Sequence, residues 1–513
     1  MKIAIVSEHA SPIAQAGGVD SGGQNIYVAH VARQLALLGH SVDVFTRLDS
    51  PYLPVEIEWN GGECGSAHNG THNGMRSGTH KGAASGICNG NSGGVRIVHV
   101  PAGPARAIPK ENLLPYMGDF ASYMERYFAS SDEAYDLIHA NFFMSALASL
   151  PVARSAGIPL AVTFHALGRV RRMHQAGADL FPDSRFEIED EIVRCADRII
   201  AECPEDRHDL INLYGAQPER ISMVPCGFDE DEMRPMDAAQ ARQRLGWDPD
   251  AFYLLQLGRM VPRKGVDNVI RALARLRNTH GVNARLCVVG GNAANPSEED
   301  TPELGRLRGI AEEEGVAQFV EFAGRRGRNQ LCRYYCAADV FVTTPWYEPF
   351  GITPVEAMAC AKPVVGSDTG GIRYTVVDGK TGFLVPPKDP DALAGKLNIL
   401  ASDRALARSM GLAGRQRSMR LFTWTQVGKQ LAGIFQEMAA AHAVVPHARL
   451  DLRDEISRKA GLRPAGLLDA RHGDARHGDA RRGNARHGDA RRGKSDARTP
   501  GMLLGGAVHT DLA

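Results

Sequence analysis

Short apolar runs alternate with stretches of helical periodicity along most of the chain. In the first half, apolar side chains recur three and four positions apart in residues 26–38 and 187–196, as in amphipathic helices. The runs expected to form buried strands are residues 3–6, 42–46, 136–140 and 160–164. This alternation predicts a parallel sheet with helices on both faces.

The same pattern starts again after Pro235. Helices are expected from about Val266 and from Asp389 to Leu400. The strands predicted between them are residues 252–257, 285–289, 319–322, 340–343 and 363–365. The α/β chain is therefore expected to form two doubly wound halves, with a cleft between the carboxyl ends of their sheets.

These patterns divide the chain into four parts. We expect one Rossmann-like domain at residues 1–235, a second at 236–423, and a helix at 424–442 that crosses back onto the first. Within the first domain, residues 61–94 are rich in Gly, Asn, Ser and His and are expected to form a mobile insert. The basic tail at 443–513 includes five copies of a pentad resembling Asp-Ala-Arg-His-Gly and is predicted to be disordered.

Composition sets limits on the class of protein. A chain of 513 residues is too long to fold around one hydrophobic core, so more than one domain is expected. Its 43% hydrophobic content is ordinary for a globular protein. A net charge of +0 gives no general argument for nucleic acid, and no run approaches the roughly 20 apolar residues of a transmembrane segment. The first apolar run is too short for a signal peptide, and nine scattered cysteines favour reduced thiols. We expect a cytoplasmic protein without a nucleic-acid partner, and its oligomeric state stays open.

The most informative motif is Glu-Pro-Phe-Gly-Ile-Thr-Pro-Val-Glu, from Glu348 to Glu356. It follows a predicted strand and enters a predicted helix, which Thr353 is expected to cap, with Pro354 in its first turn. Backbone N–H groups at such a helix start bind anions, and carboxylates accept hydrogen bonds from sugar hydroxyls. An alternative for Glu356 is a capping box with Thr353, whereas Glu348 precedes the helix and is less well explained by capping.

A second loop, from Gly258 to Gly265, also lies between a predicted strand and a helix. Arg259 offers a bidentate fork and Lys264 a point charge, which suit a diphosphate and the charge that develops as it leaves. The alternative is a solvated basic turn.

Two loops of the first half carry further candidates. Gly22 and Gly23 let the backbone approach a phosphate at a helix start, although an ordinary tight turn would also explain them. Their spacing is not the Gly-x-Gly-x-x-Gly of dinucleotide folds, which argues against a dehydrogenase. His165 follows a predicted strand and is a catalytic candidate or a structural histidine. The arginines after it, which fit an anionic partner, are Arg169, Arg171 and Arg172.

No motif predicts a metal site. Asp248-Pro249-Asp250 and Asp389-Pro390-Asp391 are interpreted as turns and caps. The spacing of Cys64, His68, His72, His80 and Cys88 fits no closed zinc site well, and the tail histidines, including His472, His477 and His487, fit none better.

Together these motifs resemble the retaining glycosyltransferases of family 4, which have the two-domain GT-B fold. The resemblance extends from about Met1 to Ala441 and is interrupted by the insert. Its best motif is the Glu-x7-Glu loop. The resemblance implies that Glu356 binds the ribose of a nucleoside diphosphate sugar and that Glu348 holds the transferred hexose. The backbone N–H groups that would assist are those of Phe350, Gly351 and Ile352.

The resemblance also implies how the diphosphate and the reacting carbon are held. Arg259 and Lys264 would bind the diphosphate, with Gly22 and Gly23 closing on it from the other half. His165 would contact the donor sugar beside the anomeric carbon. Such enzymes retain the anomeric configuration without a carboxylate nucleophile, and no cofactor beyond the nucleotide sugar is expected.

Within the family, residues 22–25 and 165–169 resemble the sucrose and sucrose-phosphate synthases. Residues 189–201 and 213–216 are also similar to the transferase that starts mycothiol synthesis on inositol phosphate. Both comparisons imply a UDP-sugar donor and a hydroxyl acceptor such as a phosphorylated sugar or polyol. Arg169, Arg171 and Arg172 would bind this acceptor. Two alternatives stay open: another GT-B nucleotide-sugar enzyme, such as an epimerase, and a non-catalytic protein that binds sugar nucleotides.

Overall fold

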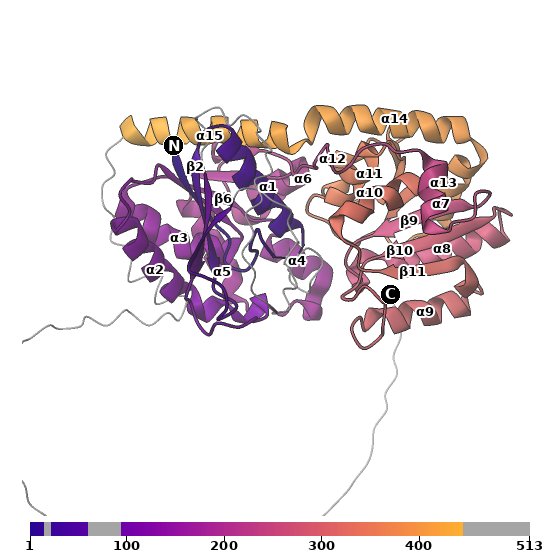
Figure 1. Cartoon of the computed structure of the whole chain (residues 1–513), viewed down its shortest axis with the longest axis horizontal. Helices are drawn as coiled ribbons and strands as arrows, with labels where there is room; N and C mark the ends of the chain where they lie inside the picture. Colours follow the sequence, from indigo (N-terminus) through magenta and orange to yellow (C-terminus); the bar gives the residue numbers. More distant parts are fainter. Residues whose placement is uncertain (15–21, 60–93, 445–513) are drawn as a thin grey trace, which may run out of the picture. The chain divides into compact units, whose positions relative to one another are not determined.

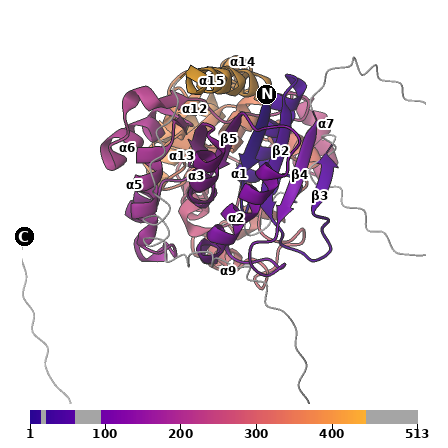
Figure 2. The same ribbon diagram turned by 90° about the vertical axis from the view of Figure 1, so that its left-hand side faces the viewer.

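The computed structural model describes residues 1–14, 22–59 and 94–444, which form two sheets with their own helices (Figure 1). The strands of the first sheet are β1 (Lys2–Val6), β2 (Ser41–Arg47), β3 (Glu56–Trp59), β4 (Val95–Val100), β5 (Leu137–Asn141), β6 (Leu160–Thr163), β7 (Arg198–Ala201) and β8 (Ile221–Met223). Their order is β3-β4-β2-β1-β5-β6-β7-β8. Only β3 runs antiparallel to its neighbour, and it lies at the outer edge (Figure 2).

Helices connect most of the parallel neighbours in this sheet, whereas the connection from β2 to β4 includes β3. The α-helices are α1 (Gly23–Leu37), α2 (Met117–Ala129), α3 (Phe143–Ala156), α4 (Gly168–Gln175), α5 (Ser184–Cys195) and α6 (Pro204–Tyr214). The short 3₁₀ turns are η1 (Lys110–Asn112), η2 (Leu114–Tyr116), η3 (Ala176–Ala178) and η4 (Pro218–Arg220).

The second sheet is parallel throughout, in the order β11-β10-β9-β12-β13-β14. Its strands are β9 (Phe252–Leu257), β10 (Ala284–Val289), β11 (Val320–Gly324), β12 (Val340–Thr343), β13 (Val364–Ser367) and β14 (Gly382–Val385). Its helices and turns are α7 (Ala238–Leu245), η5 (Pro262–Lys264), α8 (Val266–Asn278), α9 (Glu303–Glu313), η6 (Ala317–Phe319), α10 (Arg328–Ala337), α11 (Ile352–Ala359), α12 (Ile372–Thr375), α13 (Pro390–Ser402) and α14 (Arg404–Leu421).

The predicted fold class is confirmed, because two Rossmann-like halves follow one another along the chain. The strands expected at residues 252–257 and 340–343 match β9 and β12, and the other expected strands overlap observed ones. The strands that were not predicted are β3, β4, β7, β8 and β14. All but β4 have at most four residues, and the apolar run of β4 is interrupted by Arg96 and His99. Residues 61–93 of the predicted insert and 445–513 of the predicted tail lie outside the described residues.

The last helix, α15 (Trp424–Val444), packs against α1 of the first half (Figure 1). Trp424 is 2% exposed, stacks on His30 with ring centres 5.0 Å apart, and meets Tyr27 edge-on. Phe435 lies against His139 of β5 at 5.2 Å. The apolar face of α15 is therefore buried in the core of the first half. No helix among the described residues is both long and apolar enough to cross a bilayer.

Replacing Trp424 by Ala should lower the free energy of unfolding by about 3–5 kcal/mol, because it leaves a cavity between α15 and α1. Urea denaturation followed by circular dichroism would measure the change. Leu412 of α14 is 58% exposed, so Leu412→Ala is a control that should change stability by less than about 0.5 kcal/mol. Equal effects of the two substitutions would contradict this account of the packing.

Two histidines in this region make stability depend on pH. Burial lowers the pKa of His30 and of His139 from 6.5 to about 3. The folded chain keeps both rings neutral, so the unfolded chain binds more protons below pH 6.5. Their contribution is therefore complete above pH 6.5 and falls as the pH drops towards 3, by at most about 1.4 kcal/mol per histidine and pH unit. His139→Leu should flatten the decline of Tm below pH 6.5; a slope equal to that of the wild type would contradict this assignment.

Candidate active site

A cavity of about 360 Å³ opens between the carboxyl ends of strands from the two sheets. His165 reaches it from the end of β6, and Gly258 and Gly290 reach it from the ends of β9 and β10. Every residue predicted to bind the donor lines this cavity, as does His165: Gly22, Gly23, Arg259, Lys264, Glu348, Phe350, Gly351, Ile352 and Glu356. The structure thus brings the predicted residues together, while their individual roles stay predictions.

Two loops of the second half form one wall, and hydrogen bonds hold them to each other. The backbone N–H of Trp346 donates to the carbonyl of Arg263 at 2.9 Å, and Arg263 Nη1 donates to the carbonyl of Tyr347 at 3.3 Å. Deeper in the loops, Thr344 Oγ1 donates to the carbonyl of Gly265 at 2.8 Å. The loop after β9 and the loop after β12 therefore form one unit.

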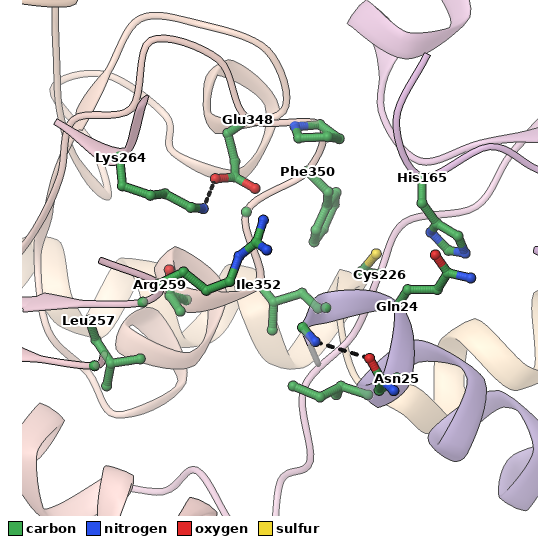
Figure 3. A pocket seen from close by; sticks show the side chains of 18 of the residues that line it. Gln24, Asn25, His165, Cys226, Leu257, Arg259, Lys264, Glu348, Phe350 and Ile352 are labelled. Carbon is green, nitrogen blue, oxygen red and sulfur yellow. Dashed lines mark hydrogen bonds and ion pairs between the residues drawn. The ribbon is translucent and has the colours of Figure 1, made fainter. Parts of the chain in front are cut away.

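An ion pair joins the two loops at the cavity surface, where Lys264 Nζ donates to Glu348 Oε2 (Figure 3). The two side chains are only 19% and 16% exposed. Burial raises the pKa of Glu348, but Lys264, Arg263 and Arg259 outweigh it, so that the net pKa is lowered. Burial lowers the pKa of Lys264, and Glu348 opposes this shift. The pair presents an ionised carboxylate beside cations, which suits a ligand with both hydroxyls and negative charge.

A glycine pair that the sequence analysis did not identify supports the Glu348 loop from behind. The N–H of Gly371 donates to the carbonyl of Glu348 at 2.9 Å. A Cβ on Gly370, whose φ is +48°, would lie 2.2 Å from that carbonyl oxygen. A Cβ on Gly371 would lie 2.4 Å from the Cα of Phe350. Only glycine permits this contact, and the signal available in the sequence was a Gly-Gly pair shortly after a buried strand.

The predicted cap of the donor helix is wrong. Helix α11 begins at Ile352, so Thr353 lies inside its first turn. The alternative that Glu356 forms a capping box with Thr353 is therefore also wrong. Glu356 is 2% exposed and accepts hydrogen bonds from Arg328 Nη2 at 3.1 Å and from the Tyr335 hydroxyl at 2.8 Å. These two donors of α10 hold the carboxylate at the cavity, where it can act as a ligand.

The first half contributes the start of α1. The N–H of Gly22 donates to Asn25 Oδ1 at 3.0 Å (Figure 3), and a Cβ on Gly23 would lie 3.4 Å from Ile352 Cδ1. The amino ends of α1 and α11 therefore approach each other across the cavity, and both favour an anion. Residues 15–21, which precede this glycine pair, lie outside the described residues.

His165 is held on both ring nitrogens. Nδ1 lies 2.8 Å from Glu202 Oε1, and Nε2 lies 3.0 Å from Asn141 Oδ1. Tyr27 packs edge-on against the ring at 4.7 Å. The backbone φ of His165 is +58°, an uncommon conformation for a residue with a side chain. Such strain is found at sites where surrounding contacts impose it, as they do here.

The carboxylate behind His165 belongs to Glu202, which the sequence analysis missed. Glu202 is 3% exposed and also accepts a hydrogen bond from the Cys226 thiol at 2.9 Å. Burial raises its pKa, but His165 and the Cys226 hydrogen bond reverse this, so that the net pKa is lowered. An ionised Glu202 requires a proton on Nδ1 of His165, and it therefore sets the orientation of the ring.

The three arginines predicted to bind the acceptor do not share one location. Arg171 lines the cavity and pairs with Asp179 at 2.8 Å, whereas Arg169 and Arg172 are not among the lining residues. Arg169 pairs with Asp190, and Arg172 with Asp179 and Asp183. Residues one or two positions apart on a helix point in different directions, so Arg171 of α4 faces the cavity while Arg172 and Arg169 do not.

The balance of charge indicates what the cavity can bind. Among its described lining residues, the basic side chains outnumber the carboxylates Glu202, Glu348 and Glu356. The basic residues are Lys110, Arg171, Arg259, Arg263, Lys264, Arg325, Arg326 and Arg328. Of these residues, only Arg171, Arg259 and Lys264 were predicted from the sequence. A cavity with these charges is suited to a polyanion such as a diphosphate.

The aspartate pairs form turns and caps, as predicted. Asp248 Oδ1 accepts from the N–H of Asp250 at 2.9 Å, and Asp389 Oδ1 accepts from the N–H of Ala392 at the start of α13. The candidate ligands between Cys64 and Cys88 and the tail histidines lie outside the described residues.

Two Rossmann-like halves that contribute to one cavity are the arrangement of the GT-B fold, and comparison with known proteins identifies the class as glycosyltransferase. The profile of group 1 glycosyl transferases matches residues 237–417, and that of glycosyltransferase family 4 matches residues 21–232. The chain therefore belongs to glycosyltransferase family 4 and is a glycosyltransferase.

Individual relatives are similar over nearly their whole length. A D-inositol 3-phosphate glycosyltransferase of Acidothermus cellulolyticus is 33% identical, over 88% of this chain and 94% of that protein. D-inositol 3-phosphate glycosyltransferase 1 of Catenulispora acidiphila is 35% identical, over 85% of this chain and 95% of that protein. The structure of a sucrose-phosphate synthase from Thermosynechococcus elongatus matches with a TM-score of 0.73 and 30% identity, over 86% of this chain and 100% of that chain.

Glu202→Gln should lower kcat/KM for glycosyl transfer by about 10- to 100-fold, the effect of losing a charged hydrogen bond of about 1.5–3 kcal/mol. The physical reason is that a neutral amide no longer fixes the protonated Nδ1 of His165. The pH profile of kcat/KM should shift as well, which loss of packing alone would not produce. Glu191→Gln, on the half-buried surface of α5, is the matched control and should retain wild-type activity. An unchanged pH profile in Glu202→Gln would refute the positioning role.

Proposed function

We propose that the protein transfers a hexosyl group from a UDP-sugar to a hydroxyl of a phosphorylated sugar or polyol, with retention of the anomeric configuration. The observation that carries this proposal is the cavity in which the Lys264–Glu348 pair of the second half lies opposite His165 of the first (Figure 3). Two relatives are D-inositol 3-phosphate glycosyltransferases, and the structural neighbour is a sucrose-phosphate synthase. These names support a phosphorylated acceptor.

The donor would lie along the wall formed by the second half. Each oxygen of Glu356 accepts one hydrogen bond from the protein, from Arg328 and from Tyr335, which leaves lone pairs for the hydroxyls of a ribose. Arg259 and Lys264 would bind the diphosphate, assisted by the amino ends of α1 and α11. The hexose would then reach Glu348 and the backbone N–H groups that follow it.

Transfer would proceed on one face of the sugar. The bond between the anomeric carbon and the diphosphate oxygen breaks, a bond to the acceptor oxygen forms on the same face, and the acceptor proton passes to the leaving phosphate. The cations around the diphosphate would stabilise the charge that develops there. Glu348 is already paired with Lys264, which supports a binding role and not that of a nucleophile. Closure of the cavity would exclude water and limit hydrolysis of the donor.

The acceptor would occupy the part of the cavity formed by the first half. Lys110 and Arg171 line it there, and both lie near Glu111, at 3.8 and 3.7 Å respectively. Two cations from separate elements suit the phosphate of an acceptor. Of the three predicted acceptor arginines, this proposal retains Arg171 as the one in direct contact.

Glu348→Gln and Lys264→Met should each lower kcat/KM by about 10²–10³-fold, because each removes a charged group that would contact the donor in the transition state. Product formation would be followed by mass spectrometry with UDP-sugar in excess. Glu437→Gln and Lys429→Met, on the exposed surface of α15, are matched controls and should retain full activity. Full activity in both site variants would contradict the proposal.

Arg171→Ala should raise KM for a phosphorylated acceptor by about tenfold or more, the loss expected for one charged hydrogen bond. It should leave slow hydrolysis of the UDP-sugar unchanged. Arg172→Ala is a sharp control, because Arg172 also pairs with Asp179 but does not line the cavity. Equal effects of the two substitutions would reject direct contact between Arg171 and the acceptor.

The substrate classes would be tested with UDP-, GDP- and ADP-sugars against inositol phosphates and sugar phosphates. Mass spectrometry would detect the products, and NMR would establish their anomeric configuration. We expect transfer from a UDP-sugar with retention. Conversion of the donor without any acceptor would instead indicate an epimerase, and inversion would overturn the proposed stereochemistry.

A further inference from the structure

Three cysteines far from one another in the sequence meet in the core of the second half. Cys332 and Cys336 lie one turn apart on α10, and Cys360 lies at the carboxyl end of α11. All three are buried free thiols, and their sulfur atoms lie within 4.8 Å of one another. Among the described residues, only this group brings three potential metal ligands of this kind so close together.

Their spacing matches what a tetrahedral metal requires. With metal–sulfur bonds of about 2.3 Å, two thiolates on one zinc ion lie about 3.8 Å apart. Cys332 Sγ and Cys360 Sγ are 3.9 Å apart, close to this distance. Buried cysteines that serve only as small apolar side chains have no need to converge on one point.

An oxygen ligand lies on the same side of the cluster. The thiols of Cys332 and Cys336 both donate to the backbone carbonyl of Arg234, at 3.1 and 3.4 Å. When the thiols lose their protons, this oxygen loses both donors and becomes available as a fourth ligand. Three sulfurs and one oxygen would complete a closed tetrahedral site.

We propose that Cys332, Cys336 and Cys360, with the carbonyl oxygen of Arg234, form a structural binding site for one thiophilic divalent cation of the zinc type. On binding, each thiol releases one proton to solvent and forms one sulfur–metal bond. This site departs from the expectation of a protein without metal, and it is independent of the proposed substrates.

The location of the site gives it a structural role. Arg328, Cys332 and Cys336 follow one another at intervals of four along α10, and Glu356 and Cys360 do so along α11. The ion pair of Arg328 with Glu356 therefore lies next to the thiol cluster on the same two helices. A bound ion would join α10, α11 and the segment at Arg234, and would hold Glu356 in place at the cavity.

The test uses the full chain with Cys64→Ser and Cys88→Ser, which removes the other candidate cysteines. The protein is stripped with a chelator under reducing, oxygen-free conditions and titrated with Co²⁺, whose thiolate complexes absorb strongly in the near ultraviolet. We expect one equivalent of Co²⁺ with this absorption, its displacement by Zn²⁺, and a rise in Tm with Zn²⁺. Histidine ligands alone do not give the absorption, so the tail does not interfere.

Adding Cys332→Ser, Cys336→Ser and Cys360→Ser should abolish the absorption, whereas the matched substitution Cys195→Ser of a half-buried thiol on α5 should not. If the triple variant fails to fold, X-ray absorption of the zinc-loaded parent decides. Three sulfurs at about 2.3 Å support the site. Fewer than three sulfurs, or a folded triple variant that retains the cobalt absorption, would overturn it.

Discussion

The ion pair between Lys264 and Glu348 is the constraint on which the cavity depends. A carboxylate and an ammonium with little access to water each need a counter-charge, and each supplies it to the other. Lys264 follows β9 and Glu348 follows β12. Their ion pair therefore holds the loops after these two strands close together. The backbone bonds between the loops and the close contact of Gly370 with the Glu348 carbonyl then leave the loops little alternative. The cavity is thus preorganised by electrostatics before any ligand enters.

Opposite this wall, the first half holds its candidate catalytic residue, His165, by contacts of a different kind. His165 is held by a carboxylate, an amide and an aromatic edge, and these contacts maintain a backbone conformation that an isolated residue would avoid. One wall is therefore ordered by paired charges within adjacent loops, and the other by buried groups from several strands. Such a division suits an enzyme that binds one substrate firmly and brings reacting atoms to it.

The sequence predicted those parts of the site that are contiguous along the chain. The Glu348–Glu356 loop and the Arg259–Lys264 loop could be recognised because strand, loop and helix follow one another directly. Glu202 could not, because its role arises only when β7 lies beside β6 and brings it to His165. The cluster of Cys332, Cys336 and Cys360 could not be predicted for the same reason, since its members come from two helices. The predicted cap at Thr353 was wrong because Gly351, with a φ of +90°, turns the chain two residues earlier and allows the helix to begin at Ile352.

The chain passes between the two halves twice, and the two passages are bonded to each other. The N–H of Phe228 donates to the carbonyl of Phe422 at 2.8 Å, and the N–H of Trp424 donates to the carbonyl of Phe228 at 3.1 Å. A single flexible linker would let the halves separate, twist or slide in any direction. Two connections that are hydrogen-bonded to each other instead act as one hinge. Such a hinge favours rotation about one axis and resists separation, twisting and sliding of the halves. Whatever motion opens this cavity should therefore return the loops of one half to the same register against the other on every cycle.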